Sequence, residues 1–154
     1  MRISRHQMFM EMSRAVAKRS TCPRLNVGAI IVSPSLEIFM GYNGSEPGED
    51  HCIDVGCLIM KNSCIRTIHA EENALRKIPY APSDEPQMVI YITNSPCSRC
   101  TDRIIASRHI RAVYFENEYR SIDHLHQFEG HGITVLRIVP NGCIMNLQGD
   151  VIET

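Results

Sequence analysis

Two short motifs constrain the fold of this chain more than any other feature: His-Ala-Glu at residues 69–71 and Pro-Cys-Ser-Arg-Cys at residues 96–100. One imidazole and two thiolates can supply three of the four ligands that zinc prefers. A structural site fills all four positions with protein, whereas a catalytic site leaves one for water. The motifs therefore predict a catalytic zinc ion held by His69, Cys97 and Cys100, which the fold has to bring together.

Both sets of ligands are predicted to lie at helix N-termini. Cys97 and Cys100 stand three residues apart in the first turn of a predicted helix, where the helix dipole favours the thiolate. His69 and Glu71 do not face each other along a helix wall, so they converge only near the helix end. The metal is therefore expected where two helix N-termini meet.

Glu71 is the predicted proton carrier. Two thiolates neutralise the charge of zinc, so a nearby base is needed to take a proton from the water. Glu71 can do this and can then deliver protons to a ring nitrogen and to departing ammonia. Hydrolytic deamination uses each of these parts, and the combined pattern of the two motifs is the known signature of zinc-dependent nucleobase deaminases.

A closed structural zinc site is the alternative interpretation of the same motifs. Cys22 or Cys143 would then be the fourth ligand, and Glu71 would be an ordinary exposed helix residue. Such a site needs neither the proline before the Cys-x-x-Cys nor the glutamate two residues after the histidine. Their presence favours the catalytic interpretation.

Length and composition indicate one globular domain spanning residues 1–154. The chain is 44% hydrophobic and 21% charged, which is ordinary for a globular protein. No apolar run approaches the roughly 20 residues needed to cross a membrane, and the N-terminus does not resemble a secretion signal. We therefore expect a cytoplasmic protein, in the host cytoplasm if the source is a virus, with no membrane partner.

Charge and cysteine count narrow the possible partners. The net charge is −1, with no basic block. This disfavours nucleic acid as a partner but is compatible with a small phosphorylated substrate. An odd number of cysteines, seven, indicates reduced thiols and metal ligation, not a disulfide framework.

The hydrophobic pattern predicts a three-layer α/β domain with helices covering a mixed sheet of about five strands. A hairpin is expected over 27–42, because its two strands are separated by a short turn. The predicted helices are 4–20, 70–78, 97–107 and 121–129, and the predicted strands are 27–32, 37–42, 88–93, 110–115 and 132–139.

The segment between residues 43 and 64 reads as a long loop, and loops of this length are usually functional or disordered. It contains His51, Cys52, Cys57 and Cys64. A second, structural zinc ion bound by these four residues would order a segment with little apolar content. The alternative is that these are buried free cysteines, which are common.

Most of the chain resembles the cytidine and deoxycytidylate deaminase superfamily, and more specifically its deoxycytidylate (dCMP) branch of bacterial and phage type. The segments that carry the resemblance are Val-Gly-Ala at 27–29, Gly-Tyr-Asn-Gly at 41–44, 66–74 around the histidine motif and 91–100 around the cysteine motif. The motif His-Cys-x-Asp-x-Gly-Cys at 51–57, which follows the Gly-Tyr-Asn-Gly segment, resembles sequences of the dCMP branch in particular.

The resemblance implies a cytidine-deaminase-like fold and the hydrolysis of dCMP to dUMP and ammonia. It also implies that zinc binds His69, Cys97 and Cys100, that Glu71 shuttles protons, that Asn43 contacts the sugar and that the backbone of Ala70 reads the pyrimidine edge. Members of this branch are typically homohexamers, activated by dCTP and inhibited by dTTP, with Mg²⁺ accompanying the nucleotide.

The remaining candidates concern the effector or the substrate phosphate. The effector site is expected at the turn containing Gly41, Tyr42 and Gly44 and in the loop that follows, although the glycines can equally be turn residues. Arg24 and Arg66 are candidate phosphate ligands, or else solvated surface residues. Tyr119 is a candidate for contact with the base or the phosphate, or for packing.

Other functions are compatible with the same fold. A nucleoside deaminase is disfavoured by the segment 41–57, and a tRNA deaminase by the near-neutral charge. A non-catalytic nucleotide-binding or zinc-stabilised protein is disfavoured because no member of the zinc and glutamate set is missing. Nothing in the sequence suggests the DNA or membrane contact expected of a DNA-uptake factor.

Overall fold

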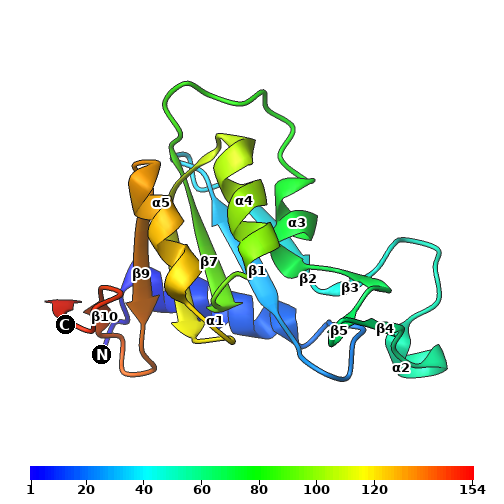
Figure 1. Ribbon diagram of the computed structural model, residues 1–154. Coiled ribbons are helices and arrows are strands. Elements are labelled where there is room, and N and C mark those ends of the chain that lie inside the picture. The colour runs from blue at the N-terminus through cyan, green and yellow to red at the C-terminus, as the bar shows by residue number, and fades with distance from the viewer.

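A seven-stranded mixed sheet forms the centre of the computed structural model, which describes all residues from 1 to 154 (Figure 1). Its strand order is β11-β10-β9-β8-β7-β1-β2. β8 runs parallel to both β7 and β9, and all other neighbours are antiparallel. The strands are β1 (Gly28–Val32), β2 (Ile38–Tyr42), β7 (Met88–Asn94), β8 (Ile110–Asn117), β9 (Thr134–Ile138), β10 (Ile144–Met145) and β11 (Val151–Glu153).

The predicted three-layer α/β fold is confirmed, but the sheet has seven strands and not about five. The five predicted strands correspond to β1, β2, β7, β8 and β9, and the predicted hairpin is the antiparallel pair β1–β2. The two additional strands lie in the C-terminal tail, where they extend one edge of the sheet. They contain only two and three residues, too few for an alternating pattern to be recognised in the sequence.

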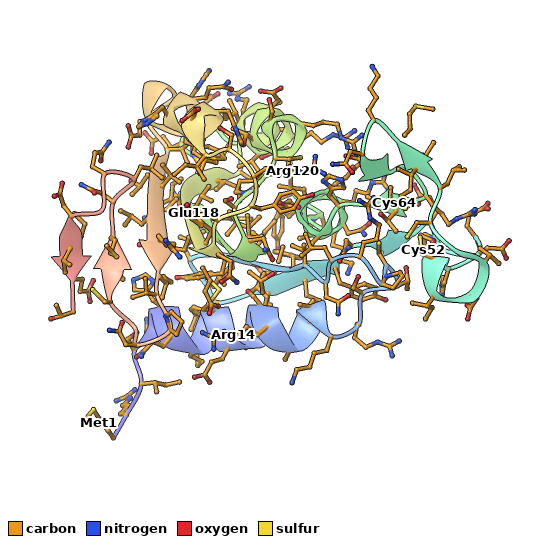
Figure 2. The ribbon with its side chains drawn as sticks, turned by 60° about the horizontal axis from the view of Figure 1, so that its bottom comes forward. Met1, Arg14, Cys52, Cys64, Glu118 and Arg120 are labelled. Atoms are coloured by element: carbon orange, nitrogen blue, oxygen red, sulfur yellow. The ribbon has the colours of Figure 1, made fainter.

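Helices cover both faces of the sheet (Figures 1 and 2). Ile30 of β1 packs in one buried cluster with Phe9 of α1. Its neighbour Ile31 points to the opposite face, where it belongs to a cluster with Ala70 of α3 and Ile104 of α4. The helices are α1 (Arg5–Ala17), α3 (Ala70–Leu75), α4 (Ser98–Ser107) and α5 (His126–Gly130), the last preceded by a 3-10 turn, η1 (Asp123–Leu125).

The helices begin and end close to the predicted positions. Ser4 caps α1, since its Oγ accepts a hydrogen bond from the Gln7 amide (3.1 Å) and Gln7 accepts one from the Ser4 amide (2.9 Å). This reciprocal pair fixes the start of the helix. The helix predicted over 121–129 is instead the short pair η1 and α5. None of the helices has the length and apolarity required to cross a membrane.

The predicted loop over 43–64 contains short elements and projects sideways from the sheet (Figure 1). At its base, β3 (Gly44–Ser45) pairs with β6 (Thr67–Ile68). We call residues 46–66 the extension; only Cys52 within it is buried. Its elements are α2 (Cys52–Val55) and the hairpin of β4 (Ile59–Met60) and β5 (Ser63–Cys64).

Candidate metal centre and active site

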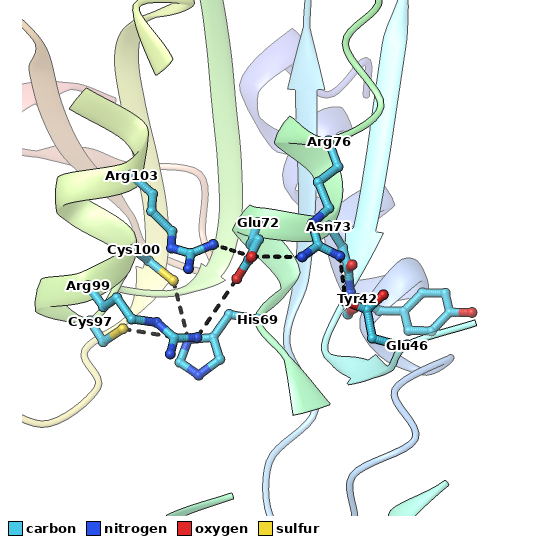
Figure 3. Close-up of polar contacts among 10 residues, drawn as sticks. All are labelled: Tyr42, Glu46, His69, Glu72, Asn73, Arg76, Cys97, Arg99, Cys100 and Arg103. Carbon is cyan, nitrogen blue, oxygen red and sulfur yellow. Dashed lines mark hydrogen bonds and ion pairs between the residues drawn. The ribbon is translucent and has the colours of Figure 1, made fainter. Parts of the chain in front are cut away.

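His69, Cys97 and Cys100 lie together at the N-termini of two neighbouring helices (Figure 3). His69 is the N-cap of α3, and Cys97 is the N-cap of α4 with Cys100 in the first turn that follows. His69 Nδ1 lies 3.2 Å from the sulfur of Cys100 and 3.5 Å from that of Cys97. The structure thus brings these three side chains to one point, as the spacing of the motifs predicted.

The electrostatics of this cluster suit a metal ion. A hydrogen bond with Cys100, followed by one with His69, lowers the pKa of Cys97 to about 3, so this thiol is ionised at neutral pH. The hydrogen bond with Cys97 raises the pKa of His69. One imidazole and two sulfurs form a donor set that zinc binds well. No fourth His, Cys, Asp or Glu belongs to the group, so the residues fit zinc with one position left open.

Glu71 lies inside the protein beside this cluster. This residue is only 4% exposed, and burial raises the pKa of its carboxyl above the ordinary value. Neither Cys22 nor Cys143 joins the cluster. The interpretation as a closed structural site required an exposed Glu71 and a fourth cysteine, and the structure provides neither.

A cavity of about 540 Å³ opens onto the cluster, and His69, Glu71 and Cys97 all line it. Its volume is in the range of pockets that bind small molecules. Arg24, Arg99 and Arg120 also line the cavity, together with polar groups such as Asn43, Asn94 and Tyr119. The cavity is therefore lined both by candidate metal ligands and by three arginine side chains.

The family model for the cytidine and deoxycytidylate deaminase zinc-binding region matches residues 3–117. The chain belongs to this family. Membership makes the protein a zinc-binding hydrolytic deaminase. It also agrees with the fold and with the cluster of one histidine and two cysteines described above.

The chain is similar to proteins named as deoxycytidylate deaminases and to one named as an operon protein. ComE operon protein 2 of Bacillus subtilis is 42% identical over 96% of this chain and 78% of that protein. The deoxycytidylate deaminase of Schizosaccharomyces pombe is 29% identical over 86% of this chain, which spans only 43% of the yeast protein. The crystal structure of the cyanophage S-TIM5 dCMP deaminase with dCMP and dUMP has a TM-score of 0.73 and 28% identity, covering 89% and 98% of the two chains.

The structure places some of the other predicted site residues in the cavity of the deaminase and others outside it. Arg24, Asn43, Ala70 and Tyr119 line the cavity. The Asn43 side chain accepts a hydrogen bond from the Val27 amide (2.8 Å) and donates one to the Leu25 carbonyl (2.6 Å). It therefore organises the segment before β1, with part of its hydrogen-bonding capacity left for a ligand.

The turn expected at residues 41–44 is reduced to the single residue Asn43, which lies between two strands. Gly41 and Tyr42 belong to β2, and Gly44 belongs to β3, which pairs with β6. None of the three lines the cavity. Gly41 is required because its backbone packs against α3, leaving no space for a side chain. Arg66 also lies outside the cavity, where it donates to the Gly56 carbonyl (3.2 Å).

Sequence reasoning missed a buried ionic network next to the metal cluster (Figure 3). Glu72 is buried and pairs with Arg76 (3.0 Å), Arg103 and Arg99 (3.8 Å). It thereby links α3 to α4, the two helices that carry the metal ligands. One signal was visible in the sequence, since Arg99 and Arg103 are four residues apart on one face of a helix.

A second group of four potential ligands lies in and beside the extension. Cys52, Cys57 and Cys64 come together as predicted, but the fourth member is Cys22 and not His51. His51 is the exposed N-cap of α2, with its Nδ1 3.9 Å from Asp54. Because the histidine precedes the helix and faces outward, it cannot join its neighbour Cys52.

Proposed function

We propose that this deaminase hydrolyses dCMP to dUMP and ammonia. The observation that carries the proposal is that candidate metal ligands, a buried Glu71 and three arginines line one cavity. The cluster suits attack on an amino-bearing carbon, and arginine suits a phosphate. The names of the yeast and cyanophage relatives, both dCMP deaminases, support the same substrate.

In the proposed mechanism, His69, Cys97 and Cys100 hold zinc. When bound, zinc lowers the pKa of water and so supplies a nucleophile at neutral pH. Glu71 accepts a proton from the attacking water and passes protons to the ring nitrogen and to the departing amino group. The bond between the ring carbon and that amino group breaks, ammonia leaves, and the carbon retains the oxygen of water as the uracil carbonyl.

The proposed substrate contacts follow from which residues line the cavity. The backbone of Ala70, between His69 and Glu71, reads the pyrimidine edge. Asn43 contacts the sugar with the hydrogen-bonding capacity that its two backbone partners leave unused. Arg24 and Tyr119, which line the same cavity, contact the phosphate or the base.

We also propose that the enzyme is a homo-oligomer, a hexamer by family resemblance, with dCTP and Mg²⁺ as activator and dTTP as inhibitor. Exposed apolar side chains gather on the extension, and such surfaces mark contact sites. They are Ile53, Val55, Leu58, Ile59, Met60 and Ile65. All seven cysteines are free, which supports the reducing cytoplasm as the proposed compartment.

A single substrate panel tests the reaction and its regulation. Ammonia release and the ultraviolet change from cytosine to uracil are measured with dCMP, dCTP, deoxycytidine and a cytosine-containing oligonucleotide. Each is tested with and without Mg²⁺ and the nucleotides dCTP and dTTP. The proposal predicts turnover of dCMP, increased by dCTP and decreased by dTTP. Turnover of another substrate in preference to dCMP would reject it, and light scattering measures the oligomer separately.

A further inference from the structure

Four cysteine sulfurs form a compact cluster away from the catalytic ligands. All four lie within 4.8 Å of one another, and two of the pairs are 3.8 Å (Cys22 and Cys57) and 3.5 Å (Cys52 and Cys64) apart. Cys52 and Cys64 are labelled in Figure 2, on the part of the ribbon that projects from the sheet. We call Cys22, Cys52, Cys57 and Cys64 the four-cysteine cluster.

The separations in the four-cysteine cluster match a tetrahedral metal site. Four sulfurs at about 2.3 Å from one zinc ion lie about 3.8 Å from each other. A disulfide instead requires a distance of about 2.0 Å between two sulfurs. Both of these pairs are therefore close to the edge length of a zinc tetrahedron and far from the length of a disulfide bond.

The extension has no apolar interior that could hold it in place. Cys52 is its only buried residue, and Cys57 and Cys64 are among only four others that are not fully exposed. Segments that cannot bury enough apolar surface need a metal or a covalent link to stay ordered. The cluster ties this segment to Cys22, which lies between α1 and β1 in the body of the fold.

We propose that the four-cysteine cluster binds a second zinc ion as a closed, structural site. Four protein sulfurs fill the tetrahedron and leave no position for water, as in structural zinc sites elsewhere. The site would carry no chemistry of its own. Its binding energy would instead fold the extension against the rest of the domain.

This second site also shapes the cavity of the catalytic centre. Cys22 and Cys64 both line that cavity, as does Asn62 in the turn between β4 and β5. Asn62 accepts hydrogen bonds from Arg24 (3.4 Å) and, at its carbonyl, from Arg120 (2.9 Å). A metal that fixes the hairpin therefore also fixes two arginines of the cavity wall.

Metal analysis of the purified full chain tests the proposal and does not depend on the substrate. The wild type is expected to hold two zinc ions per chain, and Cys57→Ser and Cys97→Ser one each. His51→Ala and Cys143→Ser are matched controls, since both residues lie outside the metal groups, and each should retain two. One zinc per wild-type chain would overturn the proposal, whether or not dCMP is turned over.

A second set of measurements guards against a variant that simply fails to fold. Cys57→His preserves a closed four-ligand site and should restore the second zinc ion that Cys57→Ser loses. Cobalt(II) loaded into the Cys97→Ser variant should give the intense visible absorption of a four-thiolate tetrahedral site. Thiols are also counted in the denatured protein, with a chelator present and no reductant, and all seven cysteines should react. A count of only three thiols would indicate two disulfides and reject the site.

Protease cleavage of the extension reports on the second zinc ion and not on the catalytic one. In Cys57→Ser, a protease should cut within residues 46–66 much faster than in Cys97→Ser, because only the former loses the metal that holds this segment. Equal protection of the two variants would show that the four-cysteine cluster does not order the extension, and would reject that part of the proposal.

Discussion

Gly41 of β2 lies directly against the backbone of Ala70 in α3. A Cβ atom added to Gly41 would overlap the Ala70 carbonyl oxygen and the Ala74 amide nitrogen. Ala70 stands between His69 and Glu71, so this contact sets how closely the start of the catalytic helix approaches the sheet. One glycine that does not line the cavity thus controls the position of two residues of the proposed active site.

Replacing this glycine should therefore damage both stability and catalysis. Gly41→Ala forces a methyl group into helix backbone, and overpacking of this kind costs about 1–3 kcal/mol. The free energy of unfolding, from urea titration, should fall by this amount, and kcat should fall with it. Gly130→Ala is the control, because no atom outside its chain neighbours and its own helix backbone lies within 4 Å of its added methyl. Equal unfolding free energies for the two variants would contradict the packing argument.

Glu71 can be tested separately from zinc binding. Glu71→Gln keeps the size of the side chain but removes the group that accepts and donates protons. We expect kcat to fall by about 10²–10⁴-fold, the scale for a positioned acid–base group, while the zinc content stays at the wild-type value. Glu129→Gln, at an exposed position, should leave kcat unchanged. Turnover near the wild-type rate in Glu71→Gln would remove this residue from the mechanism.

The role of the neighbouring Glu72 is structural, and the stability of a Glu72 variant should reveal it. Glu72→Gln leaves Arg76, Arg99 and Arg103 without a buried carboxylate, at a cost of about 1–2 kcal/mol because all three arginines are partly solvated. Glu46→Gln is the matched control, since Glu46 also pairs with Arg76 but is half-exposed. Its expected loss is below about 0.5 kcal/mol. Similar urea midpoints for both variants would refute the linking role of Glu72.

The sequence predicted those parts of the site that depend on local spacing. The motifs at 69–71 and 96–100 each place their predicted ligands at the start of a helix. Because one strand, β7, connects these two helices, few arrangements of the helix starts are possible. The fold then brings His69 to Cys97 and Cys100. Glu71 was recognised for the same reason, because its position relative to the histidine is fixed by one turn of helix.

The rest depended on contacts between distant residues, which spacing does not reveal. Cys22 is 30 residues from Cys52 and joins the four-cysteine cluster only because the segment after α1 passes beside the extension. The packing role of Gly41 was not predicted, because a glycine required by packing and one required by a turn look alike in a sequence. The burial of Glu72 follows from the proximity of α3 and α4, and from no property of its own helix.

His6 makes the stability of the fold depend on pH. Its Nδ1 lies 2.8 Å from the Tyr91 hydroxyl, and its ring packs against Tyr114. Burial lowers the pKa of His6; Glu153 raises this pKa and Arg111 lowers it, both by smaller amounts. The folded state therefore binds fewer protons at His6 than the unfolded state, in which the pKa of histidine is about 6.5. The stability contributed by neutral His6 is therefore present above that pH and is lost as the pH falls through the lower folded-state pKa.

The free energy of unfolding of the wild type should consequently decrease as the pH is lowered below about 6.5. His6→Gln cannot titrate, so the decrease should be smaller in this variant, measured by urea titration at each pH. Titration of the other histidines is common to both proteins and cancels in the difference. His131→Gln, at an exposed position, should retain the wild-type dependence. Parallel curves for wild type and His6→Gln would show that His6 does not couple folding to pH.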